Sequence, residues 1–331
     1  MSPQIPFSLL ILKEACLKNG YDFKIFDSFG NNLAKISNGK KTYYAGNGNP
    51  GTFPLNLSFA SRIARDKAWT NKILNKSGFK VIMGEHFFVN DNNRSYRKAG
   101  REIVDALRYA KGKYPLFVKP NDSVCGIFAE PVYKQSELRS QLKEISSISN
   151  IALVQEIHRL PEYRLYVVDG EVMFMYRRES PVIIGNRKEK IKNLITEFNK
   201  GIRKKKNHIS LRSKFLLNEL KRKKLNLNSR LLKGEELQIA LKSNLSSGGE
   251  IAEYRKKANK EINNWAKLLT DAMSLRICGI DVFVDGSVED PKNYTVIEVN
   301  ANPGLAGIYR AGFREDALKI SGSILGKFFK N

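Results

Sequence analysis

Two neighbouring segments decide the fold of this chain, CGIDVFVD at 278–285 and YTVIEVNANPG at 294–304. Both are rich in β-branched and aromatic residues, which favour strands. Asp285-Gly286 and Asp290-Pro291 lie between them, and such pairs mark turns. The sequence therefore predicts a β-hairpin near the C-terminus.

Alternation along this hairpin gathers oxygen-bearing side chains on one face, because successive strand residues point to opposite sides. Asp281 is expected on that face in the first strand, with Glu298 and Asn300 in the second. The apolar residues are expected on the other face. They are Ile280, Val282 and Val284 in the first strand and Ile297 and Val299 in the second. Hard oxygen ligands of this kind suit Mg²⁺. A hairpin whose polar face is simply solvated explains the same pattern.

Length and composition indicate a folded protein of two or three domains. The chain has 331 residues, 42% of them hydrophobic and 10% aromatic. No apolar run is long enough to span a bilayer, and the opening IPFSLLIL at 5–12 lacks a basic lead-in, so we expect a cytoplasmic protein without a membrane partner. The cysteines and histidines are scattered, which favours neither a disulfide framework nor a zinc site.

Charge is the unusual feature of the composition. The formal net charge is +24, and residues 187–233 hold 17 Lys/Arg against 3 Asp/Glu. This basic insertion could attract an acidic peptide or protein, a nucleic acid or an anionic substrate. A solvated lysine-rich surface is the alternative. Apolar residues at helical spacing between 211 and 220 predict that the insertion is ordered.

The remaining periodicities predict alternating helices and strands, the pattern of α/β and α+β proteins. The predicted helices are 9–19, 61–77, 97–111 and 258–275, and the predicted strands are 21–27, 80–83, 86–89, 116–120 and 151–157. Residues 162–172 are predicted to form a hairpin on the turn Asp169-Gly170. A small-residue loop at 242–249 offers hydroxyls and backbone amides.

Two strand ends carry candidate nucleotide contacts. Lys119 lies on the predicted strand 116–120, and the small-residue turn after it includes Ser123 and Gly126. A lysine and exposed backbone amides can bind phosphate oxygens, although a buried lysine before an ordinary turn explains the pattern equally well. At the end of strand 151–157, a backbone edge with Glu156 could hydrogen-bond a purine. Further on, Glu162 and Arg164 share a face of their strand.

The order of these motifs resembles the ATP-grasp carboxylate–amine ligases over nearly the whole chain. The closest likeness is to the ATP-grasp module of cyanophycin synthetase and of the bifunctional γ-glutamylcysteine ligase–glutathione synthetase. The segments that carry it are DK at 66–67, VKP at 118–120, QEI at 155–157, EYR at 162–164, Arg178, SPVIIGN at 180–186, NLSSGG at 244–249, RICGID at 276–281 and EVN at 298–300.

The resemblance implies a fold and a reaction. The expected fold is α+β with α/β elements: a pre-grasp segment at 1–60, an N-terminal lobe at 61–157, and a C-terminal lobe at 158–331 that contains the basic insertion. The two lobes would clamp ATP. ATP would phosphorylate a substrate carboxylate, and an amine would displace the phosphate to form an amide. The expected substrates are amino acids or peptides, and the relatives suggest a homo-oligomer.

The resemblance also assigns roles to individual residues. Asp281, Glu298 and Asn300 would hold two Mg²⁺ ions. The residues expected to bind ATP are Lys67, Lys119, Ser123, Gly126, Gln155, Glu156, Ile157 and Glu162. Those expected to act on the transferred phosphoryl or the acceptor are Arg178, Arg164, Asn244 and Ser246.

Two other functions stay open at this point. A ligase of the same class could modify a protein or ribosomal peptide that docks on the basic insertion. A protein of another class could bind nucleic acid without catalysis, with steep salt dependence. The insertion has few aromatic residues for base stacking, Phe198 and Phe215, which disfavours nucleic acid.

Overall fold

The protein is described here by a computed structural model that covers residues 5–27, 30–46, 53–92, 94–123, 126–202, 208–241, 243 and 249–330. In these ranges the strands form sheets of three, two, five and four strands. Hydrophobic cores accompany all four sheets. A search of the same ranges finds no helix with the length and apolar character needed to span a bilayer.

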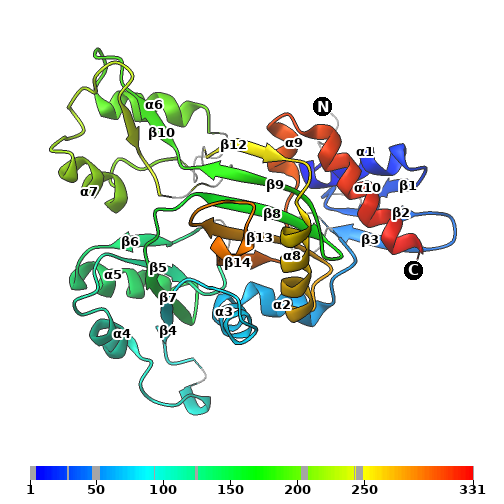
Figure 1. Ribbon diagram of the computed structural model, residues 1–331, viewed down its shortest axis with the longest axis horizontal. Coiled ribbons are helices and arrows are strands. Elements are labelled where there is room, and N and C mark those ends of the chain that lie inside the picture. The colour runs from blue at the N-terminus through cyan, green and yellow to red at the C-terminus, as the bar shows by residue number, and fades with distance from the viewer. Residues whose placement is uncertain are drawn as a thin grey trace.

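The five-stranded sheet of the C-terminal lobe is antiparallel throughout, in the order β12-β9-β8-β13-β14. Its strands are β8 (Glu162–Val168), β9 (Glu171–Glu179), β12 (Glu250–Arg255), β13 (Ile277–Val284) and β14 (Tyr294–Asn300), with the 3-10 turn η4 (Pro291–Asn293) before β14. Helix α8 (Lys260–Ala272) covers one face of this sheet, and Figure 1 shows it in front of β13.

The predicted hairpin is confirmed as β13 and β14, with Asp281 directly opposite Glu298. The alternation differs at one point. The register shifts between Asp281 and Val282, so Ile297 is an extra residue in a bulge. Val296 and Val299 therefore enter the buried core while Ile297 does not. The prediction that Ile297 shares a face with Val299 was wrong, because alternation breaks at a bulge.

The four-stranded sheet of the N-terminal lobe has the order β4-β7-β5-β6 and packs on two helices. The strands are β4 (Gly84–Phe88), β5 (Leu116–Pro120), β6 (Glu130–Val132) and β7 (Ile151–Glu156), and the helices are α4 (Ile103–Tyr109) and α5 (Gln135–Ile145), with the 3-10 turn η1 (Arg94–Tyr96). Val118 and Val154 point into this core. Lys119 and Gln155, their strand neighbours, are thereby turned to the opposite face.

Three predicted elements between residues 61 and 111 have other bounds than predicted. The predicted helix 97–111 begins only at Ile103, because Glu102 and Asp105 form a reciprocal capping box. The predicted helix 61–77 is two helices, α2 (Ser58–Arg65) and α3 (Lys67–Lys76), and both pack in the core of the five-stranded sheet. Asp66 separates them and caps α3 by accepting from the Trp69 amide at 3.0 Å. Predicted strand 80–83 is a single bridge between Val81 and Val296.

The N-terminal segment shares its core with the C-terminal helices. It comprises α1 (Phe7–Lys18) and a sheet of β1 (Asp22–Ile25), β2 (Leu33–Ser37) and β3 (Thr42–Gly46). Helices α9 (Ala306–Arg310) and α10 (Arg314–Lys330) pack with it in one hydrophobic core. Figure 1 shows the blue α1 beside the red α10. Strands β2 and β3 were not predicted.

The basic insertion is ordered in its described parts, as predicted. It continues from β9 as β10 (Val182–Ile184), α6 (Ile191–Lys200), α7 (Lys214–Arg222) and β11 (Glu236–Gln238). Strands β10 and β11 pair with each other, and these elements enclose a separate core. We call residues 182–240 the insertion lobe. Helix α7 packs against β6 of the N-terminal lobe (Figure 1).

Candidate active site

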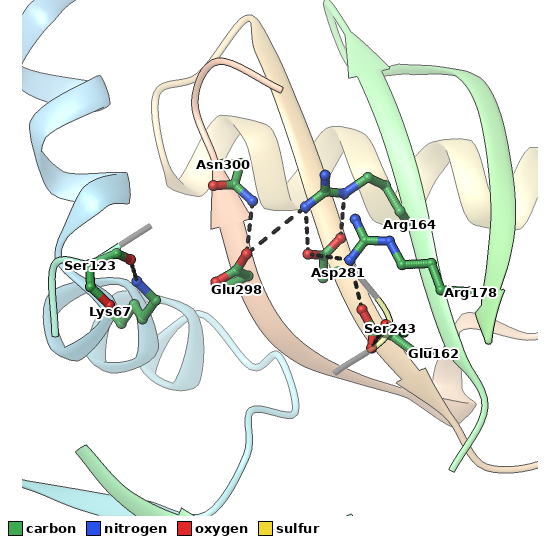
Figure 2. A network of polar contacts seen from close by, with 9 residues as sticks. All are labelled: Lys67, Ser123, Glu162, Arg164, Arg178, Ser243, Asp281, Glu298 and Asn300. Atoms are coloured by element: carbon green, nitrogen blue, oxygen red, sulfur yellow. Dashed lines mark hydrogen bonds and ion pairs between the residues drawn. The ribbon is translucent and has the colours of Figure 1, made fainter. Parts of the chain in front are cut away.

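Two arginines hold a buried aspartate at the centre of the five-stranded sheet (Figure 2). Arg164 on β8 lies directly opposite Asp281 on β13. Its Nε and Nη2 atoms each donate to an Asp281 carboxylate oxygen at 2.6 Å. Arg178 on β9 donates to Asp281 from Nη1 at 3.3 Å. Asp281 is only 2% exposed, so its charge is compensated by guanidinium groups and not by water.

Glu162 extends this network on the side of β9. It lies opposite Arg178 in the sheet and accepts from its Nη1 at 2.8 Å. The Ser243 hydroxyl donates to the other carboxylate oxygen. Burial raises the pKa of Glu162, although the neighbouring Arg178 opposes this shift. Burial would lower the pKa of Arg178, but Asp281, Tyr176 and Glu162 together raise it, so the arginine stays charged.

Glu298 and Asn300 face the open side of the same network. Asn300 Nδ2 donates to Glu298 Oε1 at 2.9 Å, and Arg164 Nη2 is 3.9 Å from that oxygen. The Glu298 side chain is 30% exposed. Burial opposes its ionisation, yet Lys67, Lys119 and Arg164 outweigh burial and lower its pKa to about 2. Glu298 is therefore an anion at any physiological pH.

The side chains of Asp281, Glu298 and Asn300 fit a hard cation by donor type. They offer only oxygen ligands, from adjacent positions of paired strands. Within the described ranges, no group of three or more His, Cys, Asp or Glu is arranged to hold a metal ion. The donor set is therefore two carboxylates and a carboxamide. Because Asp281 is already paired with arginines, Glu298 and Asn300 are the more accessible members.

Two lysines from outside the five-stranded sheet contribute charge to this set. Lys67, at the start of α3, donates from Nζ to the backbone oxygens of Ser123 at 2.9 Å and Asn121 at 3.3 Å. Lys119 on β5 is 7% exposed. Burial, more than the nearby Lys67 charge, lowers the pKa of Lys119 to about 8, while Glu298 works against that shift. Lys67 therefore lies beside Ser123.

The end of β7 presents a buried amide and an exposed carboxylate. Gln155 is 1% exposed, and its Oε1 atom has no hydrogen-bond partner in the described part of the chain. Glu156 is 62% exposed, and Ile157 is half-buried. Beyond them, the His158 ring stacks on Phe283 of β13, with centroids 5.5 Å apart. An unpartnered buried acceptor such as Gln155 Oε1 is suited to a hydrogen-bonding ligand.

The structure brings together most of the residues that the sequence singled out, although their roles stay predictions. Figure 2 shows Glu162, Arg164, Arg178, Asp281, Glu298 and Asn300 in one group, with Lys67 and Ser123 apart from it. Asn244 and Ser246 lie outside the described residues. Sequence reasoning missed Ser243, His158 and Phe283. The period-2 pattern of β13 places Phe283 on the same face as Asp281, so that signal was available.

The fold is the ATP-grasp fold, and the α+β prediction with its grasp architecture is confirmed. The crystal structure of a bifunctional glutathione synthetase from Pasteurella multocida aligns with 96% of this chain and 44% of that chain, at a TM-score of 0.55 and 19% identity. Residues 235–324 match the RimK-like ATP-grasp domain.

Two groups of curated proteins are similar in sequence to most of this chain. The chain is 28% identical over 309 residues to the glutathione biosynthesis bifunctional protein GshAB of Clostridium perfringens, covering 91% of this chain and 38% of that protein. It is 26% identical over 280 residues to cyanophycin synthetase of Trichormus variabilis, covering 81% of this chain and 29% of that protein. The predicted resemblance to both is confirmed. The chain spans about two fifths or less of the length of these relatives.

Proposed function

We propose that this protein is an ATP- and Mg²⁺-dependent ligase that joins an amino-acid or peptide carboxylate to an amine. The carboxylate oxygen attacks the γ-phosphorus of ATP, and the bond to the bridging oxygen breaks to release ADP. The amine then attacks the acyl phosphate carbonyl, loses a proton and expels phosphate. Glutathione synthetase-like activity is one member of this class.

The observation that carries the proposal is the placement of cations around two neighbouring carboxylates. The charges of Lys67, Lys119 and Arg164 act on Glu298. Arg164 and Arg178 donate to Asp281. Arg164 and Arg178 project from the five-stranded sheet, whereas Lys119 projects from the four-stranded sheet and Lys67 from the start of α3. Fixed positive charges are what a transferring phosphoryl group and an acyl phosphate require. Arg178 is nearly buried, at 7% exposure, and two carboxylates hold its guanidinium in place. Such a group stabilises developing charge without first having to reorganise.

The likeness to ATP-grasp ligases supports the other binding roles. Lys67, Lys119 and the turn with Ser123 and Gly126 would bind the phosphates. The adenine would lie against the Gln155–Ile157 end of β7, and Glu162 is the candidate for the ribose hydroxyls. Asp281, Glu298 and Asn300 would hold Mg²⁺. Bound Mg²⁺ would neutralise phosphate charge during transfer. Asn244 and Ser246 would shape the acceptor side.

The decisive experiment measures phosphate release from ATP over a panel of amino acids, γ-glutamyl dipeptides and acidic peptides, with mass spectrometry of the products. A ligase gives ADP, phosphate and an amide product that requires both a carboxylate and an amine. The proposal would be refuted if the protein bound no ATP, or if ATP were hydrolysed without any dependence on either substrate.

A second candidate is a ligase whose substrate is an acidic peptide or protein segment docked on the insertion lobe. The favouring observation is the exposure of basic side chains there, including Arg187, Lys188, Lys221 and Arg230. Exposed charges are screened over about 8–10 Å at physiological ionic strength. Turnover of an acidic peptide should then fall steeply between 50 and about 300 mM salt, while turnover of a small substrate should not. Equal salt dependence would exclude docking on this surface.

A further inference from the structure

We infer that helix α7 is a strut that positions the two nucleotide-facing segments of the N-terminal lobe, through Lys214 and Glu219. This inference rests on the proposed nucleotide site. Lys214, at the start of α7, connects through Gln141 to Phe128, which follows the proposed phosphate turn. Glu219, further along α7, binds Arg159 in the segment 157–161 between β7 and β8, which we call the hinge.

The first connection runs through Gln141 on α5. Lys214 Nζ donates to Gln141 Oε1 at 3.0 Å, and Gln141 Nε2 donates to the backbone oxygen of Phe128 at 2.7 Å. Gln141 is 1% exposed, so its amide cannot exchange these partners for water without moving. Phe128 adopts a left-handed backbone conformation with φ of 50°, two residues after Gly126. A single buried amide therefore joins the insertion lobe to the end of the proposed phosphate turn.

The second connection runs through the hinge. Arg159 lies two residues after Ile157 and donates to Glu219 Oε1 on α7 at 2.7 Å. Arg222 donates to the other Glu219 oxygen at 2.7 Å. The Glu219 side chain is only 5% exposed, although both arginines are largely open to solvent. A buried carboxylate that two cations satisfy fixes the position of the hinge arginine relative to α7.

The contacts of Glu219 are unusual for a helix in such a basic part of the chain. Surplus lysines and arginines surround α7, yet its one acidic residue, Glu219, is buried against the hinge. A purely solvated helix would expose that residue. Because α7 also packs against β6, it contacts the N-terminal lobe directly although it belongs to an insertion in the C-terminal lobe. Helix α7 thus connects the insertion lobe to both segments of the proposed nucleotide site.

The test measures the dissociation constant for ADP by calorimetry on the whole chain. Lys214→Met removes the hydrogen bond to Gln141 and should raise the constant about three- to tenfold. This is less than the effect of losing a direct hydrogen bond from a charged group, because Lys214 acts on the nucleotide only through Gln141 and Phe128. Gln141→Glu keeps a partner for Lys214 but replaces the donor to Phe128 with an acceptor, and should weaken ADP binding at least as much. Lys200→Met is the matched control, since Lys200 pairs with Glu197 on the exposed face of α6.

Hydrogen exchange provides a readout that does not require nucleotide. In Lys214→Met, the backbone amides at 126–130 should exchange faster than in the wild type. In Glu219→Gln, the amides at 156–160 should exchange faster. The amides around Ile195, in the core of the insertion lobe, should stay protected in both variants. The KM for ATP should rise with little change in kcat. If Glu219→Gln fails to fold, the ADP affinity and hydrogen exchange of Lys214→Met and Gln141→Glu still test the inference.

The inference is overturned if Lys214→Met and Gln141→Glu bind ADP within twofold of the wild type and leave exchange at 126–130 unchanged. A wild-type protein that bound neither ADP nor ATP would instead refute the proposed function. In that case the exchange rates alone would decide whether α7 holds the turn.

Discussion

Replacing Asp281 by asparagine tests both the stability and the chemistry of the site. Asp281 accepts two 2.6 Å hydrogen bonds from Arg164 and a third, at 3.3 Å, from Arg178. It is 2% exposed, and the Arg178 side chain is 5% exposed. Asparagine keeps the shape but removes the charge, which leaves two guanidinium groups under-compensated in the interior.

The expected loss of unfolding free energy follows from the burial of this ion pair. Breaking a buried ion pair by removing one partner costs about 3–5 kcal/mol. Glu162 still neutralises Arg178, at 2.8 Å, so we expect the lower end, about 3 kcal/mol. This is a large share of the 5–15 kcal/mol that typically separates folded from unfolded protein. The turnover should fall by about 10²–10³, the usual effect of losing one preorganised charge.

Two comparison variants separate the effects. Glu298 is 30% exposed and accepts from Asn300, so Glu298→Gln should lower turnover similarly with a much smaller change in stability. The double variant Arg164→Leu/Asp281→Leu removes the whole pair and should regain most of the lost stability, because buried pairs are often replaceable by apolar side chains. It should stay inactive.

Denaturant unfolding and phosphate release are the assays. If Asp281→Asn unfolded at the wild-type denaturant concentration and kept full ATP turnover, both the compensation argument and the metal assignment would be wrong. If stability fell as expected but turnover did not, only the metal assignment would fail.

Other consequences can be measured on the same preparations. Because the pKa of Lys119 is lowered to about 8, its cation is lost as the pH rises through that value, so kcat/KM for ATP should fall above pH 8; Lys119→Met should have a low, flat profile over this range. Gly84→Ala would place a Cβ 2.5 Å from the Val154 oxygen and 2.7 Å from the Gln155 Cα, so it should destabilise the protein by about 1–3 kcal/mol and weaken nucleotide binding, as unfolding and calorimetry would show. Ser243→Ala removes the donor to Glu162 and should cost about 1 kcal/mol in unfolding free energy.

Alternation predicted the hairpin and its oxygen-bearing face correctly, because the side-chain period of a strand is a local property. Asp281 and Glu298 came out opposite each other for that reason. The bulge at Ile297 was not predictable, since a bulge depends on how the partner strand is paired. The pairing of Asp281 with Arg164 could not be derived either. These residues are 117 positions apart, and their contact requires the register between β13 and β8.

Some elements that were not predicted do have a recognisable pattern in the sequence. Strands β2 and β3 carry alternating buried residues, Ala34 and Ile36 in one and Tyr43 and Ala45 in the other. Asn38-Gly39 lies between them, and that pair is a strong hairpin signal. The shared core of α1 and α10 had no such signal, because it joins the two ends of the chain.

The charge balance of the candidate active site indicates which kind of ligand it can accept. Four cations, Lys67, Lys119, Arg164 and Arg178, face three carboxylates, Glu162, Asp281 and Glu298. The charges of the seven groups nearly cancel, so a triphosphate entering alone would meet an almost neutral site and the carboxylate of Glu298. A triphosphate that brings divalent cations adds little net charge and supplies partners for the Glu298 and Asn300 oxygens. ATP should therefore bind far more weakly in EDTA than with Mg²⁺. Equal affinity in calorimetry would mean that the carboxylates serve only to position the arginines.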